Sequence, residues 1–266
     1  MARLNKERRV LNRLTSGFQK LRRNKTVAPS TVKASVMPDA PFFAVGDIHA
    51  CYAPLRTLMS ELNAAAEGEE TLVFIGDYID RGGNAELVLS WLFELTQIHP
   101  DKVICLMGNH ERMMLDFIDD PAGPGARWLR NGGLDTLASY GIALHQRQAD
   151  ADVAIEVANA LEAALPAGLQ DWLRALPLRW SSGNVHCVHA GMSPTRAPDD
   201  QSEDVLLWGH PKFLTTPRDD GQFVVHGHTV VPRAGVTGSR ISIDTGVYHT
   251  GRLSAVRVAP GACRFL

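Results

Sequence analysis

Cysteine is scarce in this 266-residue sequence and never forms a close pair. The four cysteines lie far apart, and no C-x-x-C motif occurs. Cys105 and Cys187 fall inside apolar runs, where a cysteine usually packs as a small, reduced hydrophobe. We therefore expect neither a disulfide scaffold nor a thiolate zinc site.

Long apolar runs are also absent. No segment approaches the roughly 20 apolar residues of a membrane span, and the N-terminus lacks the apolar core of a signal peptide. We therefore expect a cytoplasmic protein. No Gly-Lys pair occurs, which excludes a P-loop. With 45% hydrophobic residues, the chain can bury the core of one α/β domain.

Basic residues are concentrated at the N-terminus. Residues 1–33 hold ten Lys or Arg against one Glu, whereas residues 34–266 carry a net charge of −11. We therefore divide the chain into a basic N-terminal arm, residues 1–36, and a main domain, residues 37–266. An acidic main domain is not expected to bind nucleic acid.

The basic arm has an amphipathic pattern. Its apolar residues share one helical face: Leu4, Leu11, Leu14, Phe18 and Leu21. The arm is either a helix that contacts an anionic surface or an acidic partner, or a disordered tail. Translation that starts at Met37 is a third alternative and would leave every motif below intact.

What the sequence does contain is a charged loop directly after an apolar run. Residues 72–75 are rich in β-branched and aromatic residues, which predicts a buried strand of a parallel sheet. Residues 76–82, GDYIDRG, follow with two carboxylates and an arginine. Open α/β sheets place ligand sites at this end of their strands. Asp and Gly are also ordinary turn formers, so this loop alone could be a surface turn.

Four more apolar runs end in a similar way. Residues 42–45 lead to GDIH, residues 103–107 to GNHE, residues 185–188 to HAG and residues 223–225 to HGHT. One histidine at such a place is more often a core or surface residue than a ligand. Five strands that end in Asp, Asn or His at one edge of a sheet favour a ligand site.

The remaining elements follow from periodicity and turn residues. Helices are predicted over residues 54–66, 84–97 and 111–118, with helical insertions around residues 120–176. Residues 179–188 predict a hairpin. Residues 240–244 and 253–258 alternate as antiparallel strands, and we assign both to a second sheet.

The motifs GDIH, GDYIDRG, GNHE, HAG and GHT, in this order, resemble the phosphoprotein phosphatase family of metallophosphoesterases, especially its bacterial and phage serine/threonine phosphatases. The resemblance covers residues 42–253. It implies a four-layer α/β/β/α sandwich of mixed sheets, with a dinuclear metal site at the carboxyl ends of the strands. Residues 128–133 also resemble the W-x-x-N-G-G helical region that borders the substrate cleft in bacterial members. A purely structural cap is the alternative.

The resemblance implies two divalent metal ions and their ligands. The first ion would be held by Asp47, His49, Asp77 and His228, and the second by Asp77, Asn109 and His189. Asp77 would bridge them, and a bridging hydroxide would be the nucleophile. Carboxylates clustered at a strand edge repel one another unless cations neutralise them. Mixed Asp, Asn and His ligation suits Mn, Fe or Zn better than Ca, and we expect Mn.

Three further residues have roles by resemblance. His110 would protonate the leaving oxygen, Asp80 would orient His110, and Arg81 would clamp the phosphate. Two departures from the family pattern stand beside them. Ala50 replaces a usual glycine, and His210 stands where bacterial members often carry an arginine, two residues after Trp208. Arg218 or Arg127 could supply the missing guanidinium.

We therefore expect a monomeric phosphomonoesterase that acts on phosphoserine or phosphothreonine in proteins, or on a small phosphoester. The nearest rival is a symmetrical diadenosine-tetraphosphate hydrolase, which typically has GNHD and lacks the aspartate before Arg-Gly. Glu111 and Asp80 favour the phosphatase. A non-enzymatic metal-binding adaptor is a third alternative. Cysteine phosphatases are excluded because no Cys-x5-Arg occurs.

Overall fold

The computed structural model describes residues 35–144 and 149–266. The expectations for the basic arm fall on residues 1–34 and so lie outside the described residues, apart from the last two residues of the arm. Within the described ranges, no helix is long and apolar enough to cross a membrane.

The first sheet has the strand order β10-β9-β1-β2-β3. Strands β1, β2 and β3 run parallel, because a helical crossover joins β1 to β2 and another joins β2 to β3, and β9 pairs antiparallel with β1. The strands are β1 (Phe42–Val45), β2 (Thr71–Phe74), β3 (Val103–Cys105), β9 (Ala255–Ala259) and β10 (Ala262–Phe265).

The second sheet has the order β4-β5-β6-β8-β7. Its strands are β4 (Arg179–Ser182), β5 (Val185–Val188), β6 (Phe223–His226), β7 (Gly235–Thr237) and β8 (Arg240–Ser242). Strands β5, β6 and β8 are parallel. The predicted hairpin of residues 179–188 is confirmed as the antiparallel pair β4–β5.

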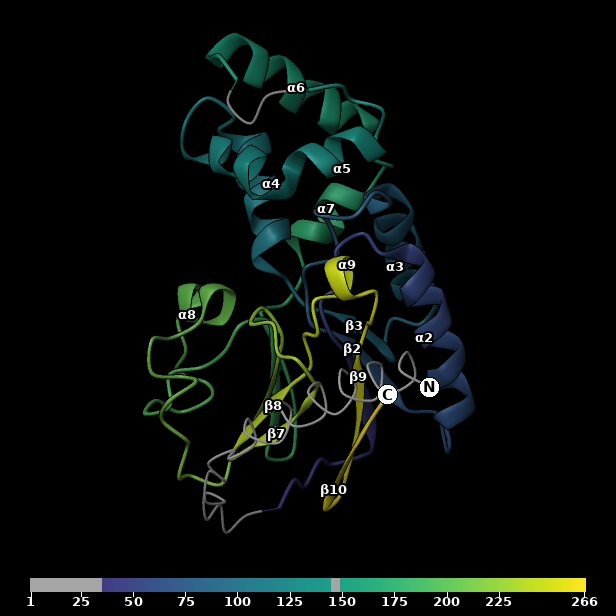
Figure 1. Ribbon diagram of the computed structural model, residues 1–266, viewed down its shortest axis with the longest axis vertical. Helices are drawn as coiled ribbons and strands as arrows, with labels where there is room; N and C mark the ends of the chain where they lie inside the picture. Colours follow the sequence, from purple (N-terminus) through teal and green to yellow (C-terminus); the bar gives the residue numbers. More distant parts are fainter. Residues whose placement is uncertain (1–34, 145–148) are drawn as a thin grey trace, which may run out of the picture. The chain divides into compact units, whose positions relative to one another are not determined.

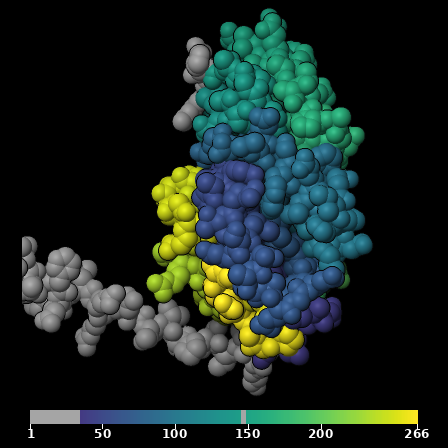
Figure 2. All heavy atoms as spheres, turned by 90° about the vertical axis from the view of Figure 1, so that its right-hand side faces the viewer, coloured from purple at the N-terminus to yellow at the C-terminus, as the bar shows by residue number. Residues whose placement is uncertain are grey.

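The two sheets pack face to face over an apolar layer that includes Ala44, Ile75, Val185 and Val225. Helices cover the outer faces (Figure 1): α2 (Tyr52–Ala65) and α3 (Ala85–Ile98) on the first sheet, α8 (Glu203–Trp208) on the second. The predicted α/β/β/α sandwich of mixed sheets is confirmed. Figure 2 shows the face that α2 and α3 form, bordered by the teal helical insertion.

The helical insertion follows α4 (Asn109–Asp119). Its elements are η1 (Pro124–Ala126), η2 (Leu129–Gly133), α5 (Leu134–Ser139), α6 (Ala151–Ala164) and α7 (Leu169–Arg174). The last helix is α9 (Val247–Thr250). Helix α4 begins two residues before the predicted start, so that Asn109 and His110 lie in its first turn.

One strand assignment from the sequence is wrong. Residues 240–244 and 253–258 were both expected in the second sheet, but β9 joins the first sheet, where Ala255 pairs with Val45. Only β8 belongs to the second sheet. Alternation shows that a strand has one apolar face and does not show which sheet it joins. The chain between β8 and β9 therefore crosses from one sheet to the other.

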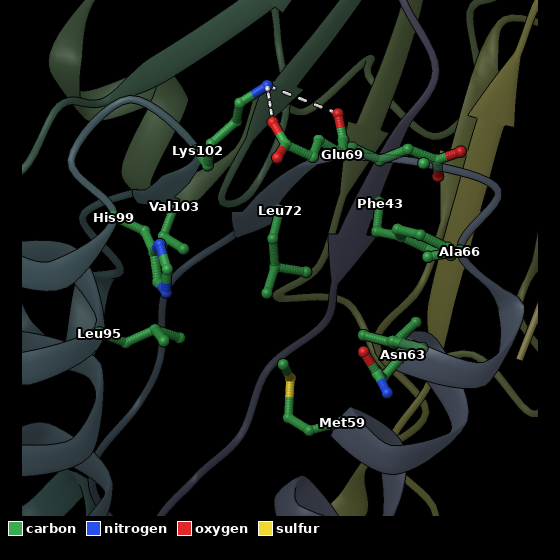
Figure 3. Close-up of a pocket in the computed structure, with 13 residues that line it drawn as sticks. Phe43, Met59, Asn63, Ala66, Glu69, Leu72, Leu95, His99, Lys102 and Val103 are labelled. Atoms are coloured by element: carbon green, nitrogen blue, oxygen red, sulfur yellow. Dashed lines mark hydrogen bonds and ion pairs between the residues drawn. The ribbon is translucent and has the colours of Figure 1, made fainter.

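A cavity of about 410 Å³ lies at the amino ends of β1, β2 and β3, between α2 and α3 (Figure 3). Its walls include Phe43, Leu72 and Val103, and Lys102 pairs with Glu69 at its rim. This cavity is at the opposite end of the sheet from the polar strand ends, so it is separate from the predicted site.

Candidate metal centre

The polar residues that follow five strands converge between the two sheets. The first sheet supplies them after β1, β2 and β3, and the second sheet after β5 and β6. The six predicted metal ligands are therefore brought together, although by two sheets and not by one sheet edge as expected. Gly76 allows the close approach, because its φ is +101° and a Cβ there would lie 2.6 Å from the Gly108 Cα atom.

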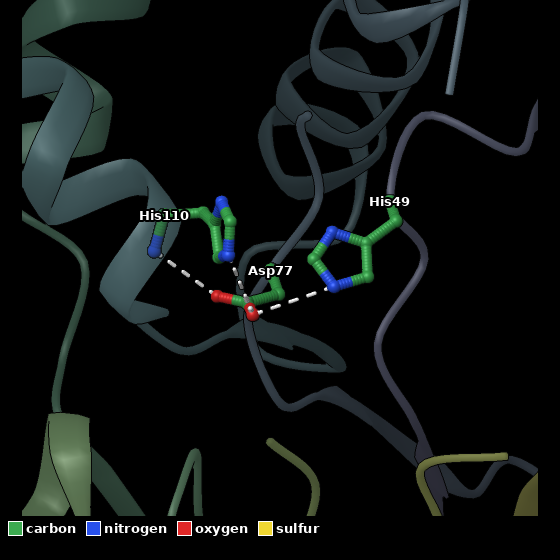
Figure 4. A group of neighbouring side chains, drawn as sticks. All are labelled: His49, Asp77 and His110. Atoms are coloured by element: carbon green, nitrogen blue, oxygen red, sulfur yellow. Dashed lines mark hydrogen bonds and ion pairs between the residues drawn. The ribbon is translucent and has the colours of Figure 1, made fainter. Parts of the chain in front are cut away.

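Asp77 lies at the centre of this group (Figure 4). Its carboxylate oxygens are 3.6 Å from His49 Nε2, 3.8 Å from His110 Nε2 and 3.3 Å from His189 Nε2. Burial alone would raise the pKa of Asp77, but the three imidazoles outweigh it and lower that pKa below its usual value. Asp77 is therefore an ionised carboxylate that is surrounded by three imidazole rings.

His189 and Asn109 place two acceptor atoms against each other. The Nδ1–H group of His189 donates to the carbonyl oxygen of Ile75, so Nε2 carries the lone pair. This lone pair lies 2.7 Å from Asn109 Oδ1, and burial lowers the pKa of His189 to about 4, so no second proton is present at neutral pH. Two facing acceptors in a buried site favour a cation that both would coordinate.

His49 is oriented in the same manner. Its Nδ1–H group donates to the carbonyl oxygen of Ile79 at 2.9 Å, which leaves Nε2 facing the carboxylate of Asp77. A backbone carbonyl that fixes the tautomer of an imidazole is typical of metal-binding histidines. Burial lowers the pKa of His49 to about 3, so its ring is neutral and able to bind a metal ion.

Asp47 adds a second buried carboxylate. It accepts the backbone N–H of His228 at 3.0 and 3.2 Å. Burial and the carboxylates of Asp244 and Asp77 raise the pKa of Asp47 well above its usual value. Oxygen and imidazole donors crowded in this way fit a pair of divalent cations, which would relieve the repulsion.

His228 lies close to other predicted metal ligands. Its Nδ1 atom lies 2.9 Å from Asn109 Oδ1, and it forms one cluster with Asp77 and His189. The resemblance had assigned His228 to the first ion, together with His49. His228 lies beside Asp77 and His189, since β5 and β6 are neighbours in the same sheet, and the ion that it would hold stays a prediction.

His110 and Asp80 form a buried hydrogen-bonded pair. His110 Nδ1 lies 2.6 Å from Asp80 Oδ2, so that this nitrogen donates and Nε2 faces Asp77 and Arg81. Burial alone would lower the pKa of His110, but Asp77 and Asp80 outweigh it and raise the pKa. A histidine that keeps its proton near neutral pH is suited to act as a general acid.

The helical insertion holds Asp80 in place. Trp128 Nε1 donates to Asp80 Oδ2 at 2.9 Å, and the Thr136 hydroxyl donates to Asp80 Oδ1 at 2.6 Å. Gly132 lies against the same residue, and a Cβ there would be 2.8 Å from the Asp80 Cβ atom. The insertion therefore contributes to the site. This favours a helical region that borders the substrate cleft over a purely structural cap.

Arg81 reaches two histidines of the site. Its Nη atoms lie 3.0 Å from His49 Nε2 and 3.2 Å from His110 Nε2. Tyr248 on α9 stacks on it, with the guanidinium carbon 4.8 Å from the ring centroid. An exposed guanidinium held among the ligands is suited to bind an anion there.

Backbone strain is concentrated at the same residues. All six non-glycine residues with positive φ among the described residues lie in or beside the site: His49, Ala50, Asp77, Asp80, Arg81 and His228. Such conformations cost ~1–2 kcal/mol each and persist where function needs them. Ala50 has φ +54°, so this departure from glycine puts an alanine in the conformation that glycine favours.

Glu111 supports the loop that carries Asp77. Its carboxylate accepts the backbone N–H groups of Asp77 at 2.9 Å, Tyr78 at 2.7 Å, Ile79 at 3.2 Å and Gly108 at 3.1 Å. These bonds cross from β3 to β2 and join two of the converging strand ends.

We expect Glu111→Gln to destabilise the fold. The amide nitrogen would face two backbone N–H groups that it cannot accept, at a cost of about 3 kcal/mol in the free energy of unfolding. Urea denaturation measures this free energy. Glu203→Gln, at an exposed ion pair with Arg112, is the matched control and should change it by less than about 0.5 kcal/mol. If the two variants are equally stable, the Glu111 carboxylate does not stabilise the loop that carries Asp77.

The bonds to Asp80 also give a prediction. Thr136→Val keeps the shape of the side chain and removes the hydroxyl, so we expect kcat on a phosphate ester with an alkoxide leaving group to fall about tenfold, with a smaller loss on p-nitrophenyl phosphate. Thr136→Ser restores the donor and should restore the rate. Trp128→Phe should behave like Thr136→Val. Equal losses on both substrates would show that these residues only stabilise the fold.

Arg218 and Arg127 were the two candidates to replace the arginine that His210 displaces. Arg218 is 4% exposed. Its guanidinium donates hydrogen bonds to the carbonyl oxygens of Ser193 and Arg196 and forms an ion pair with Asp220. It therefore cannot reach a substrate, and this alternative is wrong. Arg127 pairs with Asp116 at 2.9 Å and stacks 5.0 Å from the centroid of the Trp208 ring.

Four residues of the site were not assigned a role there from the sequence. Trp128 belongs to the W-x-x-N-G-G stretch, so its place near the site was signalled, but its bond to Asp80 was not. Thr136 gave no signal. Asp244 and Tyr248 follow β8, and the rule used for the other strands, an apolar run that ends in Asp, would have found Asp244.

An α/β/β/α sandwich with Asp, Asn and His side chains at its converging strand ends defines a metallophosphoesterase fold. Residues 40–253 match the family model described as calcineurin-like phosphoesterase. The chain belongs to the calcineurin-like phosphoesterase family.

Similar proteins carry two different names. Serine/threonine-protein phosphatase 2 of Salmonella typhimurium is 27% identical over 231 residues, which cover 81% of this chain and 92% of the relative. A symmetrical bis(5'-nucleosyl)-tetraphosphatase of Chromobacterium violaceum is 28% identical over 152 residues, 57% of this chain. This match spans only 43% of the length of that relative.

The fold also matches solved structures. The crystal structure of a putative diadenosine tetraphosphatase matches with a TM-score of 0.58 and 21% identity, over 88% of this chain and 97% of that one. At this identity the match supports the fold alone.

Proposed function

We propose that this protein is a metal-dependent phosphomonoesterase that removes phosphate from phosphoserine and phosphothreonine in proteins. The hydrogen-bonded pair of His110 and Asp80 carries the proposal. A serine or threonine alkoxide is a poor leaving group, so its departure needs a proton in the transition state. His110 Nε2 faces Asp77 and, in the protonated ring, can deliver that proton inside the site.

The other residues bind and orient. The proposed metal ligands are Asp47, His49, Asp77, Asn109, His189 and His228. When bound, divalent cations supply Lewis-acid binding of a phosphate and activation of water. Arg81 binds the phosphate oxygens, and Trp128 and Thr136 hold Asp80 so that it orients His110. Mn remains the proposed metal, with Fe or Zn as alternatives.

Hydrolysis of diadenosine tetraphosphate is the second candidate. It is favoured by the similar proteins that carry the name symmetrical bis(5'-nucleosyl)-tetraphosphatase. A metal-binding adaptor without activity is less well supported. Such a protein does not need a general acid, whereas here Asp80 orients His110 and is itself fixed by Trp128 and Thr136.

The test is an assay of chelator-treated protein reconstituted with Mn, Fe or Zn. Phosphoserine and phosphothreonine peptides, diadenosine tetraphosphate and p-nitrophenyl phosphate are compared by kcat/KM. We expect the phosphopeptides to give the highest value among the two biological substrate classes. A higher value for diadenosine tetraphosphate would favour the second candidate, and no turnover with any metal would favour the adaptor.

A further inference from the structure

A second pocket, of about 370 Å³, opens beside the metal centre. It is lined by Ala190, Trp208, Gly209, His210, Pro211, Phe213, Leu214, His228 and Thr229. His228 belongs to the proposed ligand set, and Ala190 directly follows His189. The pocket is therefore continuous with the site, and a substrate bound at the metal centre can extend into it.

The lining combines the apolar side chains of Trp208, Pro211 and Leu214 with polar groups of His210, His228 and Thr229. None of the described residues that line the pocket is Lys, Arg, Asp or Glu. Leu214 is 48% exposed, so a large apolar side chain faces solvent unless a ligand covers it. Burial of such a surface favours apolar ligands.

His210 gives this pocket a polar group that the proposed metal centre does not use. Its Nδ1 atom accepts the backbone N–H of Lys212 at 3.2 Å, so in the neutral ring Nε2 carries the proton. His210 therefore offers a single N–H donor where bacterial relatives of this type often carry an arginine. A single N–H donor can bind a backbone carbonyl, whereas the guanidinium of an arginine binds a phosphate through two N–H groups.

A polyphosphate chain is poorly matched to this lining. Its charges would meet no Lys or Arg among the described residues that line the pocket. Arg127 pairs with Asp116 and stacks on the Trp208 ring, and Arg218 is buried. The volume is also near the lower end of the roughly 300–1,000 Å³ typical of small-molecule sites. It suits one large side chain better than a dinucleotide.

We propose that this pocket binds an apolar side chain next to the phosphorylated residue of the protein substrate. The inference rests on the proposed phosphatase function and specifies its substrates: phosphoserine or phosphothreonine with a leucine-like or phenylalanine-like neighbour. Leu214 contacts that side chain, and His210 donates to the peptide backbone. Leu214 and His210 thus determine specificity and take no part in the chemical step.

The test is a set of phosphothreonine peptides that differ only in one flanking residue, on either side of the phosphothreonine. Leu, Phe, Ser, Asp and Lys are compared by kcat/KM with the metal-loaded, full-length protein. We expect Leu or Phe at one of the two positions to exceed Ser by about tenfold or more, and Asp to be the poorest.

Variants of Leu214 locate the preference. Leu214→Asp should abolish the advantage of an apolar neighbour and raise the relative rate for Lys, and Leu214→Ser should reduce the advantage. Val236→Asp is the matched control, because Val236 is 47% exposed on β7, and it should leave the preference in place.

The outcomes separate the two proposals. Peptides that are hydrolysed equally well with every neighbour, or a preference that survives Leu214→Asp, would overturn the pocket assignment and leave the phosphatase function standing. Hydrolysis of diadenosine tetraphosphate without hydrolysis of any peptide would overturn both.

Discussion

Replacement of Asp77 by Asn should abolish nearly all turnover. Asp77 is 2% exposed and shares its carboxylate among His49, His110 and His189. The amide would remove the charge that these groups surround and that two cations would share. We expect kcat/KM to fall by at least about 1,000-fold, which corresponds to ~4 kcal/mol of transition-state stabilisation.

Metal content gives a second measurement for this variant. Asp77→Asn should retain fewer metal ions per chain after reconstitution than the wild type, as measured by inductively coupled plasma mass spectrometry. Asp101→Asn, at an exposed turn before β3, is the matched control and should keep both metal content and rate. Near-normal activity of Asp77→Asn with full metal content would exclude Asp77 as the shared ligand.

Replacement of His110 by Asn should have an effect that depends on the leaving group. A nitrophenolate leaves without a proton, whereas a serine alkoxide needs one. Loss of a positioned general acid typically costs about 10²–10⁴ in rate. We therefore expect a loss in this range on phosphoserine peptides and a much smaller loss on p-nitrophenyl phosphate, with metal content unchanged.

Two further variants complete this comparison. Asp80→Asn should follow the same pattern more weakly, because it removes the orienting charge and leaves the imidazole. His99→Asn, exposed at the other end of the sheet, should not change either rate. If His110→Asn lowers both rates by the same factor, His110 binds phosphate or metal and does not donate a proton.

The strand ends could be predicted from the sequence because their signal is local. An apolar run followed by Gly and then Asp, Asn or His occupies consecutive residues, and parallel strands bring such ends together. The partner of each strand is not a local property. β8 and β9 have the same alternation, and only the packing of their apolar faces decides which sheet each one joins.

The contacts around Asp80 could not be predicted for the same reason. Trp128 and Thr136 are 48 and 56 residues away along the chain, and they reach Asp80 only because the insertion folds back over the loop after β2. The burial of Arg218 depends on Ser193, Arg196 and Asp220 in separate turns. An exposed phosphate-binding arginine and a buried structural arginine look alike in a sequence.

Binding of two divalent cations at these strand ends is tested most directly by a titration of chelator-treated wild-type protein with Mn²⁺. Calorimetry gives the number of ions bound, and phosphate release from a phosphothreonine peptide is followed at each point. We expect two ions per chain and turnover that rises as they bind. Protein that binds no Mn²⁺, or that hydrolyses the peptide equally well without added metal, would contradict the assignment.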